Sequence, residues 1–147
     1  MIEIKFTKTQ YENLIKLVYL GNWMINAIRT DDRIKKYEDI EQYIYSFAKE
    51  VGLDKYIEFD NELNKFFPTK EFEDDTDVDK YREEYDNETF WDELIDRLAR
   101  RDFIKEYGDN VIRKMTLKEQ IEKEHPFIEK YEEEFERYGV ERLEIKK

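Results

Sequence analysis

Serine-type nucleophilic chemistry would depend on two residues of this sequence, because it contains a single serine, Ser46, and a single histidine, His125. Such a nucleophile needs a histidine base and an acid beside it. Ser46 lies between Tyr45 and Phe47, without the glycines of a nucleophile elbow. His125 precedes Pro126 and, with no cysteine or second histidine in the chain, supplies at most one metal ligand. We therefore predict no catalytic residue of this type.

Phosphate-binding loops need glycines close together, so that backbone N–H groups can approach an anion. The chain has four glycines, and they are far apart, at positions 21, 52, 108 and 139. Neither a P-loop nor a dinucleotide fingerprint is present. We expect no bound cofactor.

The most suggestive metal pattern is acidic. Asp75, Asp77 and Asp79 have the spacing of the first ligands of a twelve-residue calcium loop. The sixth position, where the sharp turn needs glycine, is Lys80, and the twelfth is Asp86 where a longer glutamate is usual. The three aspartates are candidate metal ligands, but we predict no specific calcium site.

Carboxylates three residues apart on facing helices can hold Mg²⁺ for hydrolysis of a nucleotide or phosphoester. In a chain with 38 acidic residues such pairs arise by composition alone. The Glu-x-x-Asp pairs are Glu71/Asp74, Glu83/Asp86, Glu93/Asp96 and Glu106/Asp109. A divalent-metal-dependent hydrolase using helix carboxylates is the alternative function, and acids converging on one cleft would favour it.

A set of polar residues interrupts the most apolar stretch of the sequence. Asn22, Asn26 and Arg29 are about one helical turn apart between positions 14 and 30. Buried without partners, such groups would cost about 1 to 3 kcal/mol each. Either they satisfy buried backbone groups, or they line a small polar pocket.

The chain carries a formal net charge of −12, which repels nucleic acid at long range. We expect no direct nucleic-acid binding, and a basic protein as the partner. The partner-binding candidates lie on the last expected helix and are Glu129, Glu132, Glu133 and Glu136.

The spacing of apolar residues predicts a mainly helical fold. A helix over 8–30, opened by the Thr7/Gln10 capping box, carries apolar residues around most of its circumference and is expected at the centre of a helical bundle. Another capping box, at Thr116, opens a later helix. Residues 53–67 read as one or two short helices. The alternating ends, with Ile2, Ile4 and Phe6, and with Val140, Leu143 and Ile145, predict terminal strands that pair as a minimal sheet.

The length of 147 residues favours a single compact domain over 1–147, with a solvated acidic loop at about 68–79. We find no signal-peptide pattern and no apolar run long enough to span a membrane, so a cytoplasmic location without membrane contact is expected. The oligomeric state, monomer or homodimer, stays open. The favoured function is a non-enzymatic interaction or regulatory protein that binds a basic partner.

Overall fold

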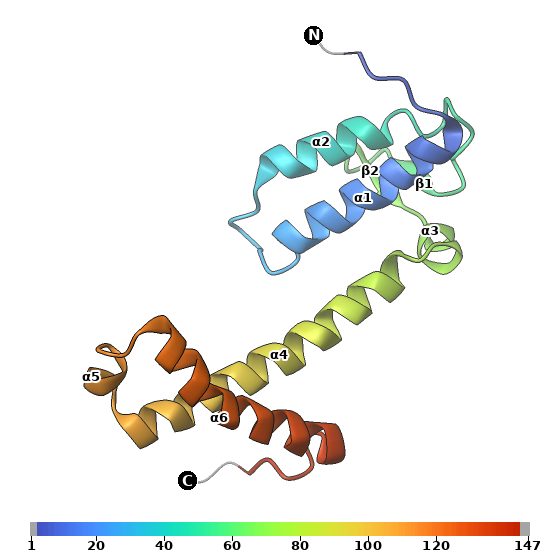
Figure 1. Ribbon diagram of the computed structural model, residues 1–147. Helices are drawn as coiled ribbons and strands as arrows, with labels where there is room; N and C mark the ends of the chain where they lie inside the picture. The colour runs from blue at the N-terminus through green and yellow to red at the C-terminus, as the bar shows by residue number, and fades with distance from the viewer. Residues whose placement is uncertain (1–2, 145–147) are drawn as a thin grey trace. The chain divides into compact units, whose positions relative to one another are not determined.

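The computed structural model describes residues 3–144 and is mainly helical, as predicted (Figure 1). The chain forms two compact units, Met1–Glu84 and Tyr85–Lys147. Each unit has its own cluster of buried side chains. The expectation of a single compact domain over 1–147 stays a prediction.

Helix α1, Lys8–Asn26, begins at the predicted capping box, in which Thr7 Oγ1 accepts from the Gln10 N–H and the Gln10 side chain accepts from the Thr7 N–H. It ends four residues earlier than expected, at Asn26. Helix α2, Lys35–Tyr45, follows after a turn and packs along α1 (Figure 1). At the end of α1 the side chain of Asn26 accepts a hydrogen bond from the Ile34 N–H and so ties the helix end to the turn before α2.

The two-stranded antiparallel sheet is a local hairpin and not a pairing of the termini. Strand β1, Ile57–Asp60, pairs with β2, Lys65–Pro68. Asp60 Oδ1 accepts from the N–H groups of Glu62 and Leu63 at 2.8 and 2.9 Å, and Asn64 adopts a φ of 52°. An aspartate that bonds the backbone ahead of it, followed by a left-handed asparagine, is typical of a tight turn. The helices predicted for residues 53–67 are therefore wrong.

The predicted terminal strands are also wrong within the described residues. Residues 3–7 and 139–144 contain no strand, and the side chains of Ile4, Phe6, Val140 and Leu143 are exposed. The predicted positions Ile2 and Ile145 lie outside the described residues. A hairpin closes a loop of a few residues, whereas pairing the termini would close nearly the whole chain, at a larger entropic cost.

The segment 68–79, predicted as a solvated loop, contains helix α3, Lys70–Asp75. Thr69 caps it by accepting from the Phe72 N–H at 3.3 Å. Phe72 is fully buried. One buried aromatic side chain therefore anchors a helix in a segment whose remaining residues are mostly acidic.

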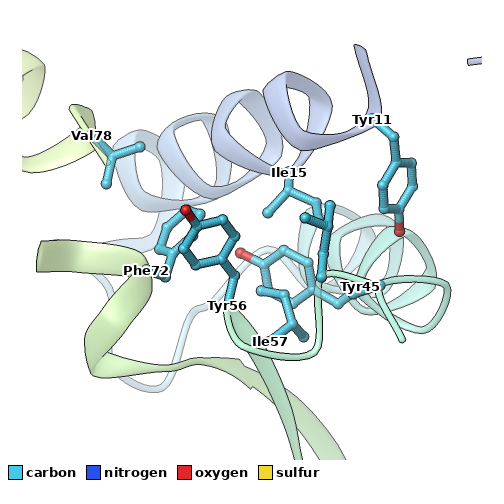
Figure 2. Packing of buried hydrophobic residues seen from close by; sticks show 9 residues of the cluster. Tyr11, Ile15, Tyr45, Tyr56, Ile57, Phe72 and Val78 are labelled. Carbon is cyan, nitrogen blue, oxygen red and sulfur yellow. The ribbon is translucent and has the colours of Figure 1, made fainter. Parts of the chain in front are cut away.

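The core of Met1–Glu84 is rich in aromatic side chains (Figure 2). The ring of Phe72 packs edge-on against Tyr19 and Tyr56, with centroid distances of 5.2 and 6.0 Å. Tyr45, 1% exposed, and Ile15 fill the space between α1 and α2. Leu17 and Met24 on α1 remain exposed, as does Ile28 just after it, and a bundle packed around this helix is not confirmed.

The second unit is built from helices. Helix α4, Val78–Tyr107, starts in the first unit, and its part after Glu84 belongs to the second. Gly108, with a φ of 78°, precedes α5, Asp109–Ile112. Helix α6, Leu117–Tyr138, opens with the predicted capping box of Thr116 and Glu119.

The apolar stripe of α6 packs on α4 and forms the core of this unit. Tyr131 and Phe135 contact the face of α4 that carries Trp91 and Ala99. No helix within residues 3–144 is long and apolar enough to cross a membrane.

Candidate functional site

Asn26, 1% exposed, connects α1 to the start of α2. Its Oδ1 accepts from the Ile34 N–H at 2.8 Å, and its Nδ2 donates to Asn22 Oδ1 at 2.7 Å. The side chain therefore satisfies a backbone group of the connecting turn. It also fixes the rotamer of Asn22 one turn earlier, because the Asn22 oxygen is already engaged.

Asn22 directs its amide group at Glu41 of α2. The Asn22 Nδ2 donates to Glu41 Oε2 at 2.8 Å, and the Tyr45 hydroxyl donates to Glu41 Oε1 at 3.2 Å. Burial raises the pKa of Glu41 above its ordinary value, although both hydrogen bonds oppose the shift. Among the described residues, no Lys or Arg forms an ion pair with Glu41; nearby Arg33 pairs with Glu38.

A pocket of about 260 Å³ lies beside this network, between α1, α2 and β2. Tyr19 and Trp23 of α1 line it together with the two asparagines, and Glu38 and Glu41 line it from α2. Strand β2 closes one side. Gln42 holds this strand in place, because its side chain accepts from the Phe66 N–H at 2.7 Å and donates to the Phe66 carbonyl at 2.9 Å.

The structure divides the polar set predicted from the sequence. Asn22 and Asn26 share a pocket wall, whereas Arg29 is not among the lining residues. Arg29 Nη1 donates to the Ile25 carbonyl, and its Nε is 3.9 Å from an Asp32 carboxylate oxygen. The two asparagines therefore do both things that the sequence left as alternatives: they satisfy backbone and each other, and they line a pocket.

Sequence reasoning missed Glu41, although a signal was present. Glu41 precedes the buried Tyr45 by four residues, so it lies on the buried face of α2. An acid on the apolar face of a helix needs polar partners. Those partners come from α1, which the spacing within α2 does not reveal.

A second polar network crosses from α4 to α6 in the other unit. Asp102 accepts from the Tyr131 hydroxyl at 2.5 Å, from Lys130 at 3.2 Å and from Arg101 at 2.9 Å. The Tyr131 hydroxyl bond, with help from the two cations, holds the pKa of Asp102 well below its ordinary value. This network joins the two helices, and its members Lys130 and Tyr131 also line a pocket of about 210 Å³ on α6.

The four glutamates predicted to bind a partner are exposed on α6. Glu129, Glu132, Glu133 and Glu136 follow each other at spacings of three, one and three residues, so they share one face of the helix. His125 Nε2 is 3.3 Å from a Glu129 carboxylate oxygen. The four acids lie on the side of α6 away from its buried stripe, and we call them the acidic face.

An open apolar hollow adjoins the acidic face. Trp91 and Ile95 of α4 line it with Phe135 of α6, and Glu132 and Glu136 stand at its edge. Its volume is about 450 Å³. This places apolar side chains and two carboxylates within one surface feature.

The other sequence candidates have local structural partners. The Ser46 hydroxyl donates to the Tyr43 carbonyl at 2.7 Å. Asp75 pairs with Lys55 at 3.1 Å, and Asp77 pairs with Lys16 at 3.5 Å. Asp79 lies 2.8 Å from Arg82. The three candidate metal ligands thus face three different basic side chains.

The described residues 3–144 contain no group of three or more His, Asp or Glu side chains placed to hold one metal ion. Members of the Glu-x-x-Asp pairs are engaged elsewhere: Glu93 pairs with Arg97, and Asp109 with Arg113. The convergence of acids that would favour a hydrolase is not observed in this part of the chain.

No family model matches this chain, and neither does any curated protein or solved structure.

Proposed function

We propose that the protein is a non-enzymatic interaction protein that binds a basic partner through the acidic face of α6. The observation that carries the proposal is that Glu129, Glu132, Glu133 and Glu136 are exposed together on one side of a helix whose opposite side is buried. Helix packing holds the four carboxylates in fixed register. A partner with regularly spaced Lys or Arg side chains would meet them without further ordering of the backbone.

The hollow beside the acidic face supports a more specific partner. Trp91 and Ile95 offer apolar contact area at the edge of which Glu132 and Glu136 stand. Apolar anchors surrounded by charge are typical of protein interfaces. The proposed partner is therefore a basic segment that also presents an apolar side chain, such as one face of an amphipathic helix.

The net charge of −12 adds long-range attraction for such a partner. Electrostatic attraction speeds association at low ionic strength and weakens as salt shortens the screening length from about 30 Å at 0.01 M to about 8 Å at 0.15 M. Binding through the acidic face should therefore be salt-sensitive.

The test captures partners from cell lysate at these two salt concentrations and measures association with each purified candidate. A variant with all four glutamates of the acidic face changed to Gln should lose the salt-sensitive partner. The matched control changes four exposed glutamates of the first unit to Gln, namely Glu50, Glu58, Glu62 and Glu71. Both variants remove four negative charges. Loss of partner binding in the acidic-face variant alone therefore supports the acidic face as the binding surface.

Equal loss in both variants would show that net charge, and not the acidic face, drives binding. Finding no salt-sensitive partner, together with Mg²⁺- or Mn²⁺-dependent turnover in a nucleotide-hydrolysis screen, would replace the proposal with the hydrolase alternative.

A further inference from the structure

We propose that the pocket between α1, α2 and β2 binds a small organic cation, with Glu41 as the counter-charge for its alkylammonium or guanidinium group. The pocket lies wholly within Met1–Glu84, whereas the acidic face lies on α6. The inference therefore does not rest on the proposed function, and either can fail without the other.

The carboxylate of Glu41 has acceptor positions to spare for a ligand. A carboxylate has about four acceptor positions. Asn22 and Tyr45 donate to one oxygen each, and both donors are neutral. Within the described residues Glu41 has no ion-pair partner, although it is half-buried in the wall of a pocket. A cation entering the pocket would supply both the missing charge and the remaining hydrogen bonds.

Aromatic rings in the pocket wall suit the same ligand. Tyr19 and Trp23 contribute from α1, and Phe66 contributes from β2. The faces of aromatic rings attract cations, and Trp does so most strongly. Trp23 already holds one cation in this way, since the Arg82 guanidinium carbon lies 5.4 Å from its ring centroid.

The basic residues of the pocket are less suited to hold an anion. Arg33 Nε donates to Glu38, and its Nη1 donates to the Asn26 carbonyl at 3.3 Å. Lys65 is exposed to solvent. The guanidinium of Arg33 is thus committed to the protein, whereas the carboxylate of Glu41 is not paired with a cation.

The groups that would contact the ligand are fixed before it binds. The Ile34 backbone orients Asn26, Asn26 orients Asn22, and Asn22 orients Glu41. A preorganised site loses less entropy when it binds.

The volume limits the size of the ligand. At about 260 Å³, the pocket falls just below the range of roughly 300 to 1,000 Å³ typical of drug-sized ligands. It admits a group of the size of butylammonium or an arginine side-chain end. Such a group belongs either to a free amine or to a Lys or Arg side chain of another protein, and the two sources share one chemistry.

Titration with two probes tests the proposal in the full-length protein. Butylammonium represents the free amine, and Nα-acetyl-lysine methylamide carries the same cation on a peptide unit. Pentanol and Nα-acetyl-norleucine methylamide are the uncharged controls. Binding is followed by Trp23 fluorescence in a Trp91→Phe background, because the chain contains two tryptophans and Trp91 belongs to the other unit.

We expect saturable binding of one or both cations, with a Kd on the order of 1 mM for such small probes, and no saturation with the uncharged controls. Glu41→Gln should weaken cation binding by about 10-fold or more. The matched control is Glu58→Gln, an exposed acid of β1 outside the pocket, which should leave the Kd unchanged. Glu41→Asp keeps the charge and should retain part of the binding.

Saturation by butylammonium alone identifies a free amine as the ligand class, and saturation by the lysine derivative alone identifies a side chain of a partner. Three outcomes would overturn the proposal: no saturation by either cation, equal affinity for the uncharged controls, or cation binding that Glu41→Gln leaves unchanged. The comparison of charged with uncharged probes uses an unaltered pocket. It therefore tests the preference for a cation even if Glu41→Gln is unstable.

Discussion

Glu41 in the first unit and Asp102 in the second are two carboxylates with opposite electrostatic surroundings. Each accepts a hydrogen bond from a tyrosine hydroxyl, of Tyr45 and Tyr131 respectively. Asp102 also meets Arg101 and Lys130, and its pKa is lowered. The second donor to Glu41 is the neutral amide of Asn22, and burial raises the pKa of Glu41 although the nearby Arg33 charge lowers it.

The difference follows from where each carboxylate lies. Asp102 is at the edge of a helix pair, where long basic side chains reach it while their ends stay in water. Glu41 is enclosed between α1, α2 and β2, where amide and hydroxyl groups are the donors at hand. The first arrangement ties two helices together, and the second leaves a charge that a ligand can pair.

The largest expected effect concerns the cores of the two units. Phe72→Ala removes a fully buried ring and should lower the free energy of unfolding of the first unit by about 3 to 5 kcal/mol. Urea unfolding followed separately by Trp23 and Trp91 in single-tryptophan variants checks this. The single-domain prediction requires Trp91 to report the same shift.

Phe103→Ala is the matched change in the second unit, since Phe103 is also fully buried. A shift seen by only the tryptophan of the altered unit, in both variants, would show that the units unfold separately and would contradict the single-domain prediction.

The next effect tests the Asp102 network. Asp102→Asn removes the charge from three hydrogen bonds and should destabilise the protein at pH 7 by about 1.5 to 3 kcal/mol. The folded pKa lies below the unfolded value of about 3.9, so this stability is present above that value and is lost as pH falls through the folded pKa.

The penalty for Asp102→Asn should therefore shrink in urea unfolding at about pH 3 relative to pH 7. The same penalty at both pH values would mean that the charge of Asp102 does not stabilise the fold.

Glu41→Gln should have a smaller effect with the opposite pH dependence. Its folded pKa is raised, so the wild-type protein loses stability as pH rises from the unfolded value of about 4.3 through the folded pKa. Gln lacks this loss, and the Tyr45 hydroxyl can rotate to accept from its amide. We expect the free energy of unfolding to change by less than about 1 kcal/mol at pH 7. The stability of the variant relative to the wild type should increase between pH 4 and pH 7.

Unfolding at the two pH values measures this gain. Glu38 and Arg33, which line the same pocket, are present in both proteins; their charges act on Glu41 in opposite directions and are smaller causes of its pKa shift than burial. If the stability of Glu41→Gln relative to the wild type falls as pH rises, the pKa of Glu41 is lowered in the folded protein and not raised.

The smallest effect is expected at an exposed pair. Arg142 lies 3.2 Å from Glu134, and its guanidinium carbon lies 4.4 Å from the Tyr138 ring centroid. Because Arg142 is 58% exposed, Arg142→Ala should cost about 0.5 kcal/mol or less in thermal or urea unfolding. If Arg142→Ala costs as much as Asp102→Asn, solvent exposure does not explain why the Arg142–Glu134 pair is expected to stabilise the protein less than the Asp102 network does.

Short-range rules succeeded at the starts of two helices. The capping boxes at Thr7 and Thr116 were predicted and are confirmed, because the residues that satisfy the first N–H groups are three positions away. The hairpin at Asp60 was also a local signal, which the helical interpretation of 53–67 overlooked. Helix α3 was missed because its stability comes from burying Phe72 against Tyr19 and Tyr56, which are remote in sequence.

The sequence by itself determined the helical character of the chain, its negative charge, and the presence of Asn22 and Asn26 within an apolar helix, because periodicity and composition are properties of neighbouring residues. Only the tertiary structure decided that Asn22 bonds Glu41 and Asn26 bonds Ile34 while Arg29 lies outside the pocket, and that residues 3–7 and 139–144 form no strand. Which carboxylate meets a cation and which meets an amide depends on how helices pack, and side-chain spacing along one helix carries no information about its neighbour.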